Sequence, residues 1–233
     1  MNGATRKDLV GAGIALLLAL GCVRLGIWQV HRLAQRKARN AAQLARWKLP
    51  ALTIASRGLP ADSADQRRVS SAGKWDYEHE RLWRPRSWEG TPGVDLVTPL
   101  LLGDGSAVLV DRGWAASPDA YHVDEQAYRE GDSGVVVGLA LRAPRGRGDV
   151  DPARLADSLG VPLLPFVIQE LPDSAHPAPR LLRWPLPAID NGPHLSYAIQ
   201  WFSFAIIITV GSIALFWRRN VRRPDVEGPG AAS

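Results

Sequence analysis

Residues 195–217 read LSYAIQWFSFAIIITVGSIALFW, a run of 23 residues without Asp, Glu, Lys or Arg. A helix rises about 1.5 Å per residue, so this run would reach roughly 35 Å. The hydrocarbon core of a bilayer is only about 30 Å thick. Four basic side chains follow and would stop a span at the lipid headgroups: Arg218, Arg219, Arg222 and Arg223. Together with His194, the run predicts a transmembrane helix over residues 194–217.

A second apolar segment near the N-terminus predicts another transmembrane helix, over residues 9–30. It carries no charge from Leu9 to Val23 and is then interrupted by Arg24. A charge so close to the end of a span is tolerated when it snorkels to the interface, pairs or faces protein. Small residues at four-residue spacing form a ridge on which the other span is expected to pack: Gly11, Ala15 and Ala19.

The same N-terminal segment also resembles two signals that are cleaved. Basic residues precede an apolar run, as in a secretory signal peptide, and LALGC at residues 18–22 loosely resembles a lipoprotein attachment box. Hydrophobicity resumes after Cys22, whereas a mature lipoprotein usually continues into a polar tether. We therefore favour an uncleaved span.

Between the spans lie about 160 residues, enough for one domain with its own core. We expect a basic helical stalk at residues 31–50, a β-rich domain at 51–171 and a proline-rich, extended return to the membrane at 172–193. Short β-prone stretches separated by Gly, Pro and Asp predict six strands: 68–73, 80–86, 94–102, 107–113, 134–142 and 164–170. Short helices are expected at 118–129 and 152–159.

The pair of strands at 94–102 and 107–113 gives the clearest hairpin, because the Asp104-Gly105 turn between them supplies positive φ angles. Several strands with short turns favour a mainly antiparallel domain, either a sandwich or a partly closed barrel. The predicted fold class is therefore a membrane protein with two transmembrane α-helices bracketing one such extramembrane β domain.

The residue types available to that domain argue against several chemistries. Copper and thiol chemistry need soft ligands or a thiol pair, yet Cys22 and Met1 are the only sulfur-bearing residues. His122 with Asp124 and Glu125 could bind a metal, but a solvated loop is the favoured interpretation. No phosphate-binding, dinucleotide or serine-elbow motif occurs. The net charge of +5 gathers at the membrane borders, where headgroups account for it without nucleic acid.

Polar and aromatic side chains at the membrane borders are then the remaining candidates for a site. His194, Tyr197 and Trp201 share one face of the second span at i, i+3 and i+7. Arg24, Trp28, His31 and Arg32 form a similar stripe on the first. An ordinary aromatic belt explains the Trp and Tyr residues equally well. A neutral histidine at an interface can also ligate haem iron, and spacing alone leaves both explanations open.

Three blocks of sequence, taken in their order along the chain, indicate a function more specifically than residue spacing does. GIWQVHRL at residues 26–33 resembles the Gly-x-Trp-Gln-x-x-Arg signature of the surfeit locus protein 1 family of cytochrome c oxidase assembly factors. VTPL at 97–100 with VLVDRGW at 108–114 resembles the central block of that family. NGPHLSYAIQWF at 191–202 resembles its block at the second span. The chain departs from the family at Asp111, where Asn is usual.

The resemblance implies an assembly factor, not an enzyme, that assists delivery of haem a to oxidase subunit I. In bacterial members a histidine of the second span is implicated in haem binding, and His194 occupies the matching position. We expect a transient haem a site formed with Tyr197, Gln200 and Trp201 and closed by Trp28 and Arg32. Residues expected to serve structure or partner contact are Gln29, Arg112, Gly113 and Trp114.

The resemblance also implies the setting of the molecule, which the charge pattern alone leaves open. The termini, residues 1–8 and 218–233, are expected in the cytoplasm of a bacterium, with the central domain outside the inner membrane. Expected partners are oxidase subunit I, the haem a biosynthetic machinery and lipids. Two alternatives stay open: a membrane-tethered scaffold that binds no haem, and an anchored hydrolase using Ser70 or Ser71 with His79.

Overall fold

The computed structural model describes residues 6–55, 61–143, 150–172 and 180–221. The chain divides into two compact units. One, the helix unit, consists of residues 1–41 and 189–233, and the other, the β unit, consists of residues 42–188. Each unit is described by itself.

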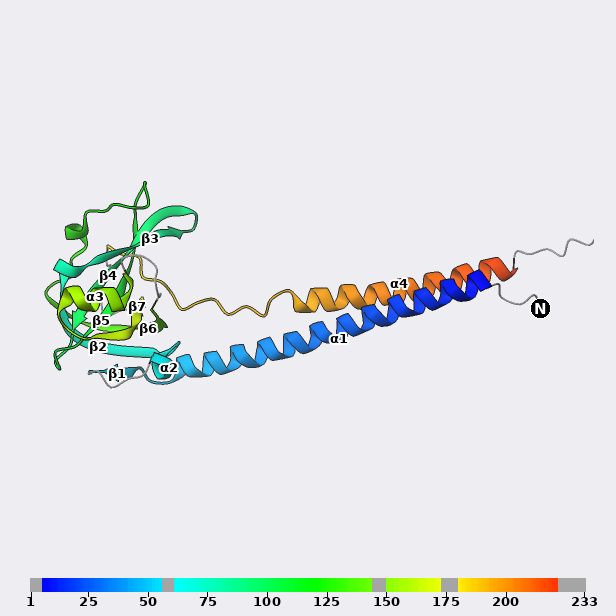
Figure 1. Ribbon diagram of the computed structural model, residues 1–233, viewed down its shortest axis with the longest axis horizontal. Helices are drawn as coiled ribbons and strands as arrows, with labels where there is room; N and C mark the ends of the chain where they lie inside the picture. The colour runs from blue at the N-terminus through cyan, green and yellow to red at the C-terminus, as the bar shows by residue number, and fades with distance from the viewer. Residues whose placement is uncertain (1–5, 56–60, 144–149, 173–179, 222–233) are drawn as a thin grey trace, which may run out of the picture. The chain divides into compact units, whose positions relative to one another are not determined.

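Two long helices form the helix unit: α1, Arg6–Lys48, and α4, His194–Val221. Both are long and apolar enough to cross a membrane. Figure 1 shows α4 running alongside α1. α1 continues without a break through the predicted first span and stalk, since residues 31–48 are rich in the helix formers Ala, Arg, Gln and Lys. It ends just before Leu49, whose helical conformation the following Pro50 disfavours.

The two helices meet along stripes with alternating three- and four-residue spacing, the pattern of helices that pack nearly parallel to each other. On α1 the buried members are Ala19, Gly26 and Gln29, and on α4 they are Ala198 and Ala205. A Cβ on Gly26 would lie 2.7 Å from the Phe202 ring, so glycine lets the helices approach there. Gly11, at the start of the expected ridge, lines a hollow together with Ser212 and Leu215 of α4, but a Cβ there would meet no atom within 4 Å.

Seven strands form the sheet of the β unit, in the order β1-β2-β6-β7-β5-β4-β3. An additional antiparallel pairing of β2 with β4 closes the five strands from β2 to β4 in that order into a barrel. Among the strands that the structure describes, only the β1–β2 and β5–β7 pairs are parallel. The mainly antiparallel, partly closed barrel is therefore confirmed, and the sandwich alternative was wrong. The strands are β1 Leu52–Ile54, β2 Arg68–Trp75, β3 Arg81–Trp88, β4 Thr91–Leu101, β5 Ala107–Ala116, β6 Ser133–Arg142 and β7 Leu163–Glu170.

All six predicted strands are present, and the hairpin of β4 and β5 turns through Gly105 at φ +78°. The predicted helix at 152–159 is α3, Pro152–Leu159, which Asp151 caps by accepting a hydrogen bond from the Ala153 N–H. The short strand β1 and the four-residue helix α2, Ala61–Ala64, were not predicted. A short 3₁₀ helix, η1, spans Tyr77–His79.

The helix predicted at 118–129 was wrong, because only the 3₁₀ helix η2, Glu125–Tyr128, forms there. The Asp119 carboxylate accepts hydrogen bonds from the backbone N–H groups of Tyr121 and His122. Asp side chains that bond to nearby backbone in this way compete with helical hydrogen bonding. Ala120, between them, has a positive φ of 59° and cannot continue a right-handed helix.

Parts of the predicted stalk and return segment belong to the β unit. In the last turns of α1, Trp47 is buried, and the side chains of Gln43 and Arg46 donate to the carbonyls of Gln66 and Asp65. In the return segment, Leu182 forms a backbone bridge with Trp114 of β5. The described residues 180–193 contain no helix or strand apart from this bridge, and residues 173–179 lie outside the described part.

Candidate functional site

The candidate site lies where α4 begins, against the middle of α1. The chain reaches α4 through Gly192 and Pro193, and Gly192 has a φ of +70°, a conformation that glycine adopts without strain. His194 is the first residue of the helix and is partly buried. Its Nδ1 lies 2.9 Å from Oε1 of Gln29, a buried side chain of α1 that is 9% exposed. This hydrogen bond joins the first and third sequence blocks.

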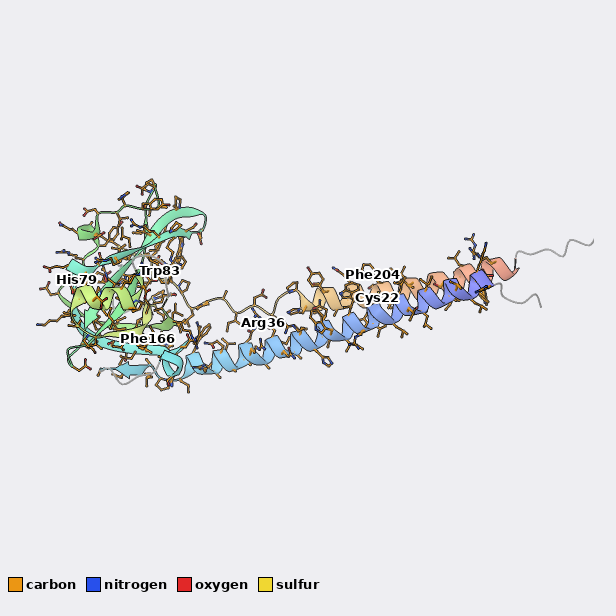
Figure 2. The ribbon with its side chains drawn as sticks, in the orientation of Figure 1. Cys22, Arg36, His79, Trp83, Phe166 and Phe204 are labelled. Atoms are coloured by element: carbon orange, nitrogen blue, oxygen red, sulfur yellow. The ribbon has the colours of Figure 1, made fainter. Side chains whose placement is uncertain are left out.

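Further hydrogen bonds hold the turn before α4 against α1. The Asp190 carbonyl accepts from Arg36 Nε at 3.2 Å and from Asn40 Nδ2 at 3.0 Å. Asn40 also donates to Oδ1 of Asn191 at 3.0 Å, and Asp190 Oδ1 accepts from the Gly192 N–H. Figure 2 labels Arg36 on α1 beside this turn. The start of α4, and with it the His194 ring, is therefore held by three side chains, Gln29, Arg36 and Asn40, that extend over about three turns of α1.

The predicted aromatic residues lie around this contact instead of enclosing it. Trp28 is 52% exposed, and the Arg32 guanidinium carbon lies 5.9 Å from the centre of its ring. Tyr197 is 46% exposed and Gln200 is exposed as well. Trp201 is half-buried and packs edge-on against Phe204, with 6.0 Å between ring centres. The structure brings together His194 and Gln29, and separately Trp28 and Arg32; the described residues contain no hydrogen bond between these two pairs.

Sequence reasoning missed Arg36 and Asn40, and it gave Gln29 only a structural or partner role. A signal was present, because Gln29, Arg36 and Asn40 follow at i, i+7 and i+11 and continue the stripe of Ala19 and Gly26. That stripe changes from small apolar residues to polar ones at Gln29. From Gln29 onward, polar side chains of this stripe form hydrogen bonds with His194 and with the turn before α4.

The β unit holds a second concentration of polar groups around Arg112, which is fully buried. Its Nη2 lies 2.5 Å from Glu80 Oε2, its Nε donates to Thr98 at 2.7 Å and its Nη1 donates to the Tyr128 carbonyl at 2.6 Å. The guanidinium also lies 5.2 Å from the centre of the Tyr77 ring. This buried charge therefore joins β5 to β4, to the residue before β3 and to η2 from inside the domain.

Asp111, beside Arg112, faces another buried carboxylate. Asp95 and Asp111 are 0% and 1% exposed, and burial first, then the Asp95 charge, raises the pKa of Asp111 well above its usual value. Burial also raises the pKa of Asp95, against the opposing effects of Arg86 at 2.5 Å and the Trp184 indole N–H at 3.0 Å. Two such carboxyl groups are most stable when they share a proton.

Gly113 ends this block in a conformation reserved for glycine, with φ +128°. A Cβ there would lie 2.6 Å from the Leu182 carbonyl oxygen, and the Gly113 N–H donates to Asp111 Oδ1 at 3.1 Å. The next residue, Trp114, is nearly buried, and its ring centre lies 6.3 Å from that of Trp88. The DRGW block therefore positions the return segment against β5.

The groups considered for hydrolysis or metal binding have other partners. Ser71 donates to the Ile54 carbonyl, Ser70 lies 3.5 Å from Thr53, and His79 pairs with Asp76 at 2.8 Å. No hydrogen bond joins either serine to His79 within the described residues. His122 pairs with Asp119, whose pKa is lowered mainly by that contact. The described part of the chain contains no group of three or more His, Cys, Asp or Glu side chains able to hold a metal.

Comparison with known proteins identifies the family to which this chain belongs. The model of the SURF1 family matches residues 16–206, which include Gln29, His194 and the whole barrel. The chain belongs to the SURF1 family. SURF1 proteins are cytochrome oxidase assembly factors, and no catalytic activity defines them. Membership and the two candidate spans together indicate a membrane-associated SURF1 protein.

SURF1-like relatives of this chain occur in several organisms. An uncharacterized SURF1-like protein of Mycobacterium tuberculosis is 27% identical over 208 residues, covering 80% of this chain and 74% of the relative. A SURF1-like protein of Rickettsia felis is 27% identical over 218 residues, covering 85% and 92%. One from Dictyostelium discoideum is 30% identical over 120 residues, covering 48% and 44%. The first two alignments extend over most of both chains.

Proposed function

We propose that this SURF1 protein assists cytochrome c oxidase assembly by receiving haem a at the outer end of its helix pair and passing it to subunit I. His194 ligates the iron, and Trp28, Arg32, Tyr197, Gln200 and Trp201 contact the rest of the molecule. The protein crosses the bacterial inner membrane twice, with the β unit on the extracytoplasmic side. It performs no catalysis of its own, and the haem is its cargo.

The observation that carries this proposal is the placement of His194. It stands at the first residue of a candidate span, partly buried, with Nδ1 held by Gln29 of the other span. A neutral imidazole with one nitrogen engaged offers the other as a ligand for iron. The exposed Trp28 and Tyr197 offer aromatic surface to a flat macrocycle, and Arg32 offers a cation to its propionates.

The openness of this surface suits a transfer function. Resident cofactors usually sit in clefts that bury most of their surface. Here the two aromatic side chains nearest the His194 contact along the sequence, Trp28 and Tyr197, are each about half exposed. A haem held at one edge of a helix pair keeps its other face free for the acceptor protein.

The experiment is to purify the protein from cells that also make haem a and to measure its visible spectrum and haem content. Wild type is expected to carry haem a with the spectrum of a histidine-ligated iron, and His194→Ala to lose most of it. His122→Ala is the matched control, since His122 is an exposed histidine of the β unit that pairs with Asp119. Equal haem content in wild type and His194→Ala would refute the ligand role.

A scaffold that stabilises oxidase subunits without haem is the second candidate, and the same half-exposed aromatic surface favours it. Such a surface can bind a transmembrane helix of another protein as readily as a porphyrin. In that case the protein copurifies with oxidase subunits but carries no pigment, whether or not haem a is made.

A further inference from the structure

The hydrogen bond between Gln29 and His194 has a defined donor and acceptor. This determines which ring nitrogen of His194 keeps a lone pair for a ligand. A neutral imidazole carries its proton on one nitrogen only, and the hydrogen bond made by that nitrogen selects the tautomer. The Gln29 atom facing Nδ1 is Oε1, which can only accept a hydrogen bond. This hydrogen bond therefore forms only when the proton resides on Nδ1, and in that tautomer Nε2 keeps a free lone pair.

We propose that Gln29 is a positioning residue that holds His194 as the Nδ1–H tautomer, with Nε2 presented as the ligand atom. The inference deepens the proposed function and rests on it for the identity of the ligand's target. The tautomer itself is a property of the haem-free protein. A carbonyl oxygen at Nδ1 is a usual outer partner of metal-binding histidines, where it fixes ring orientation and raises basicity.

The surroundings of the pair favour a single orientation of both side chains. Gln29 is buried at the helix contact, one turn from Gly26, where Phe202 packs directly on the backbone of α1. His194 is anchored from behind by the turn that Arg36 and Asn40 hold. Because the Gln29 side chain is only 9% exposed, replacing this hydrogen bond with one to water would leave Gln29 poorly solvated.

Gly192 contributes by leaving the Nε2 edge of the ring clear. A Cβ built on Gly192 would lie 3.5 Å from both Nε2 and Cδ2 of His194, in van der Waals contact with that edge. A side chain at position 192 would therefore begin in contact with the nitrogen that is proposed to bind iron. The positive φ of Gly192 disfavours such side chains for an independent reason.

The direct test is ¹⁵N NMR of the haem-free full chain, labelled at histidine, in nanodiscs at a pH where imidazole is neutral. Protonated and unprotonated ring nitrogens have well-separated shifts, and the spectrum of His194→Ala assigns the signal. We expect wild-type His194 to carry its proton on Nδ1. A proton on Nε2, or an even mixture of tautomers, overturns the proposal without any variant of Gln29.

Two variants of Gln29 then separate positioning from packing. Gln29→Glu keeps an oxygen acceptor at the same place and is expected to preserve the Nδ1–H tautomer. Gln29→Leu keeps a side chain of similar size but removes the hydrogen-bond acceptor, so the Nε2–H form should become prominent. Gln35→Leu, an exposed glutamine of the same helix, is the matched control and should match wild type. Loss of the tautomer preference in Gln29→Glu as well would show that the oxygen is not what selects it.

A second readout links the tautomer to haem. In protein loaded with haem a, Gln29→Leu is expected to bind about 10- to 100-fold more weakly, the usual effect of losing an outer partner of a ligand. Gln29→Glu should retain binding and lower the midpoint potential of the iron, because its carboxylate makes the imidazole more electron-rich. An unchanged potential in Gln29→Glu would contradict the role of Gln29.

Absence of haem from every protein, with Nδ1–H in wild type, would instead refute the proposed function and leave the tautomer assignment intact.

Discussion

At the residue scale, Asp111 explains how the chain departs from its family without losing the local structure. The resemblance to the central block of the family places Asn at this position, and an Asn amide could both accept from the Gly113 N–H and donate to a neighbouring carboxylate. A protonated Asp111 can do the same, accepting from Gly113 and donating to Asp95. The raised pKa of Asp111 is therefore what allows an acid to replace an amide here.

Asp111→Asn is expected to stabilise the protein and flatten its pH dependence. An acid whose pKa is raised by folding holds its proton in the folded state, so its contribution is fully present below the unfolded pKa of about 4 and is lost as pH rises through the folded pKa. The amide has no proton to lose. At neutral pH the free energy of unfolding should rise by about 1 to 3 kcal/mol.

Urea unfolding of the full chain in detergent, followed by tryptophan fluorescence between pH 4 and 8, measures this effect. Wild type should lose stability relative to Asp111→Asn across that window. Parallel curves for the two proteins would mean that Asp111 does not bind a proton on folding.

Arg112 gives a second prediction at this scale. Arg112→Ala leaves the buried Glu80 carboxylate without its cation and is expected to cost about 3 to 5 kcal/mol of folding free energy. Arg142→Ala is the control, because the Arg142 ion pair with Asp65 is largely exposed and such pairs contribute about 0 to 1 kcal/mol. Thermal melts of the full chain distinguish the two. Similar melting temperatures for both variants would contradict the structural role of Arg112.

At the element scale, the sequence predicted those features that local chemistry controls. Strands alternating with Gly, Pro and Asp turns were predicted correctly, as was the helix α3, because each depends on neighbouring residues. The Asp151 cap of α3 was not predicted. The failed helix at 118–129 depends on the side chain of Asp119, whose hydrogen bonds compete with a helix. Barrel closure by β2 and β4, and the partner of His194, depend on residues far apart in the chain. Spacing placed His194 on a face with Tyr197 and Trp201. The stripe on α1 placed Gln29 on the face toward α4, but spacing within one helix does not show which residue of the other helix it meets.

The packing of α1 on α4 makes a testable element-scale prediction at Gly26. Gly26→Leu is expected to push Phe202 away and open the helix pair near Cys22, the single cysteine, which is half-buried on the same stripe and is labelled in Figure 2. Alkylation of Cys22 by a membrane-permeable maleimide should become several-fold faster. Adding Phe202→Ala should restore the slow rate by making room for the leucine.

Gly13→Leu is the control for this experiment, because Gly13 is exposed and a Cβ there would meet nothing within 4 Å. Its alkylation rate should equal that of wild type. If Gly26→Leu alkylates no faster than Gly13→Leu, the close contact of Gly26 with Phe202 does not exist in the membrane.

At the scale of the whole molecule, two units with different tasks share one chain. The β unit is a barrel stabilised by a buried ionic network, and within the described residues it offers no cluster of groups suited to metal binding. The helix unit carries the polar groups that two of the three family blocks supply. The proposed topology places the β unit outside the cytoplasm and both ends of the chain inside.

Single cysteines in a Cys22→Ser background test this topology. Ser158→Cys, exposed on α3, is expected to react with a membrane-impermeant maleimide in intact spheroplasts. Ser233→Cys, at the end of the basic tail, should react only after lysis. Labelling of both cysteines in intact spheroplasts, or of Ser233→Cys alone, would contradict the proposed orientation.

The central claim is that His194 ligates haem a, and its most direct test is chemical rescue. The visible spectrum of purified His194→Ala in the presence of haem a should lack the bands of a histidine-ligated iron. Added imidazole, which can occupy the space left by the missing ring, should restore those bands and the bound haem. The account is contradicted if His194→Ala binds haem a with the wild-type spectrum before any imidazole is added.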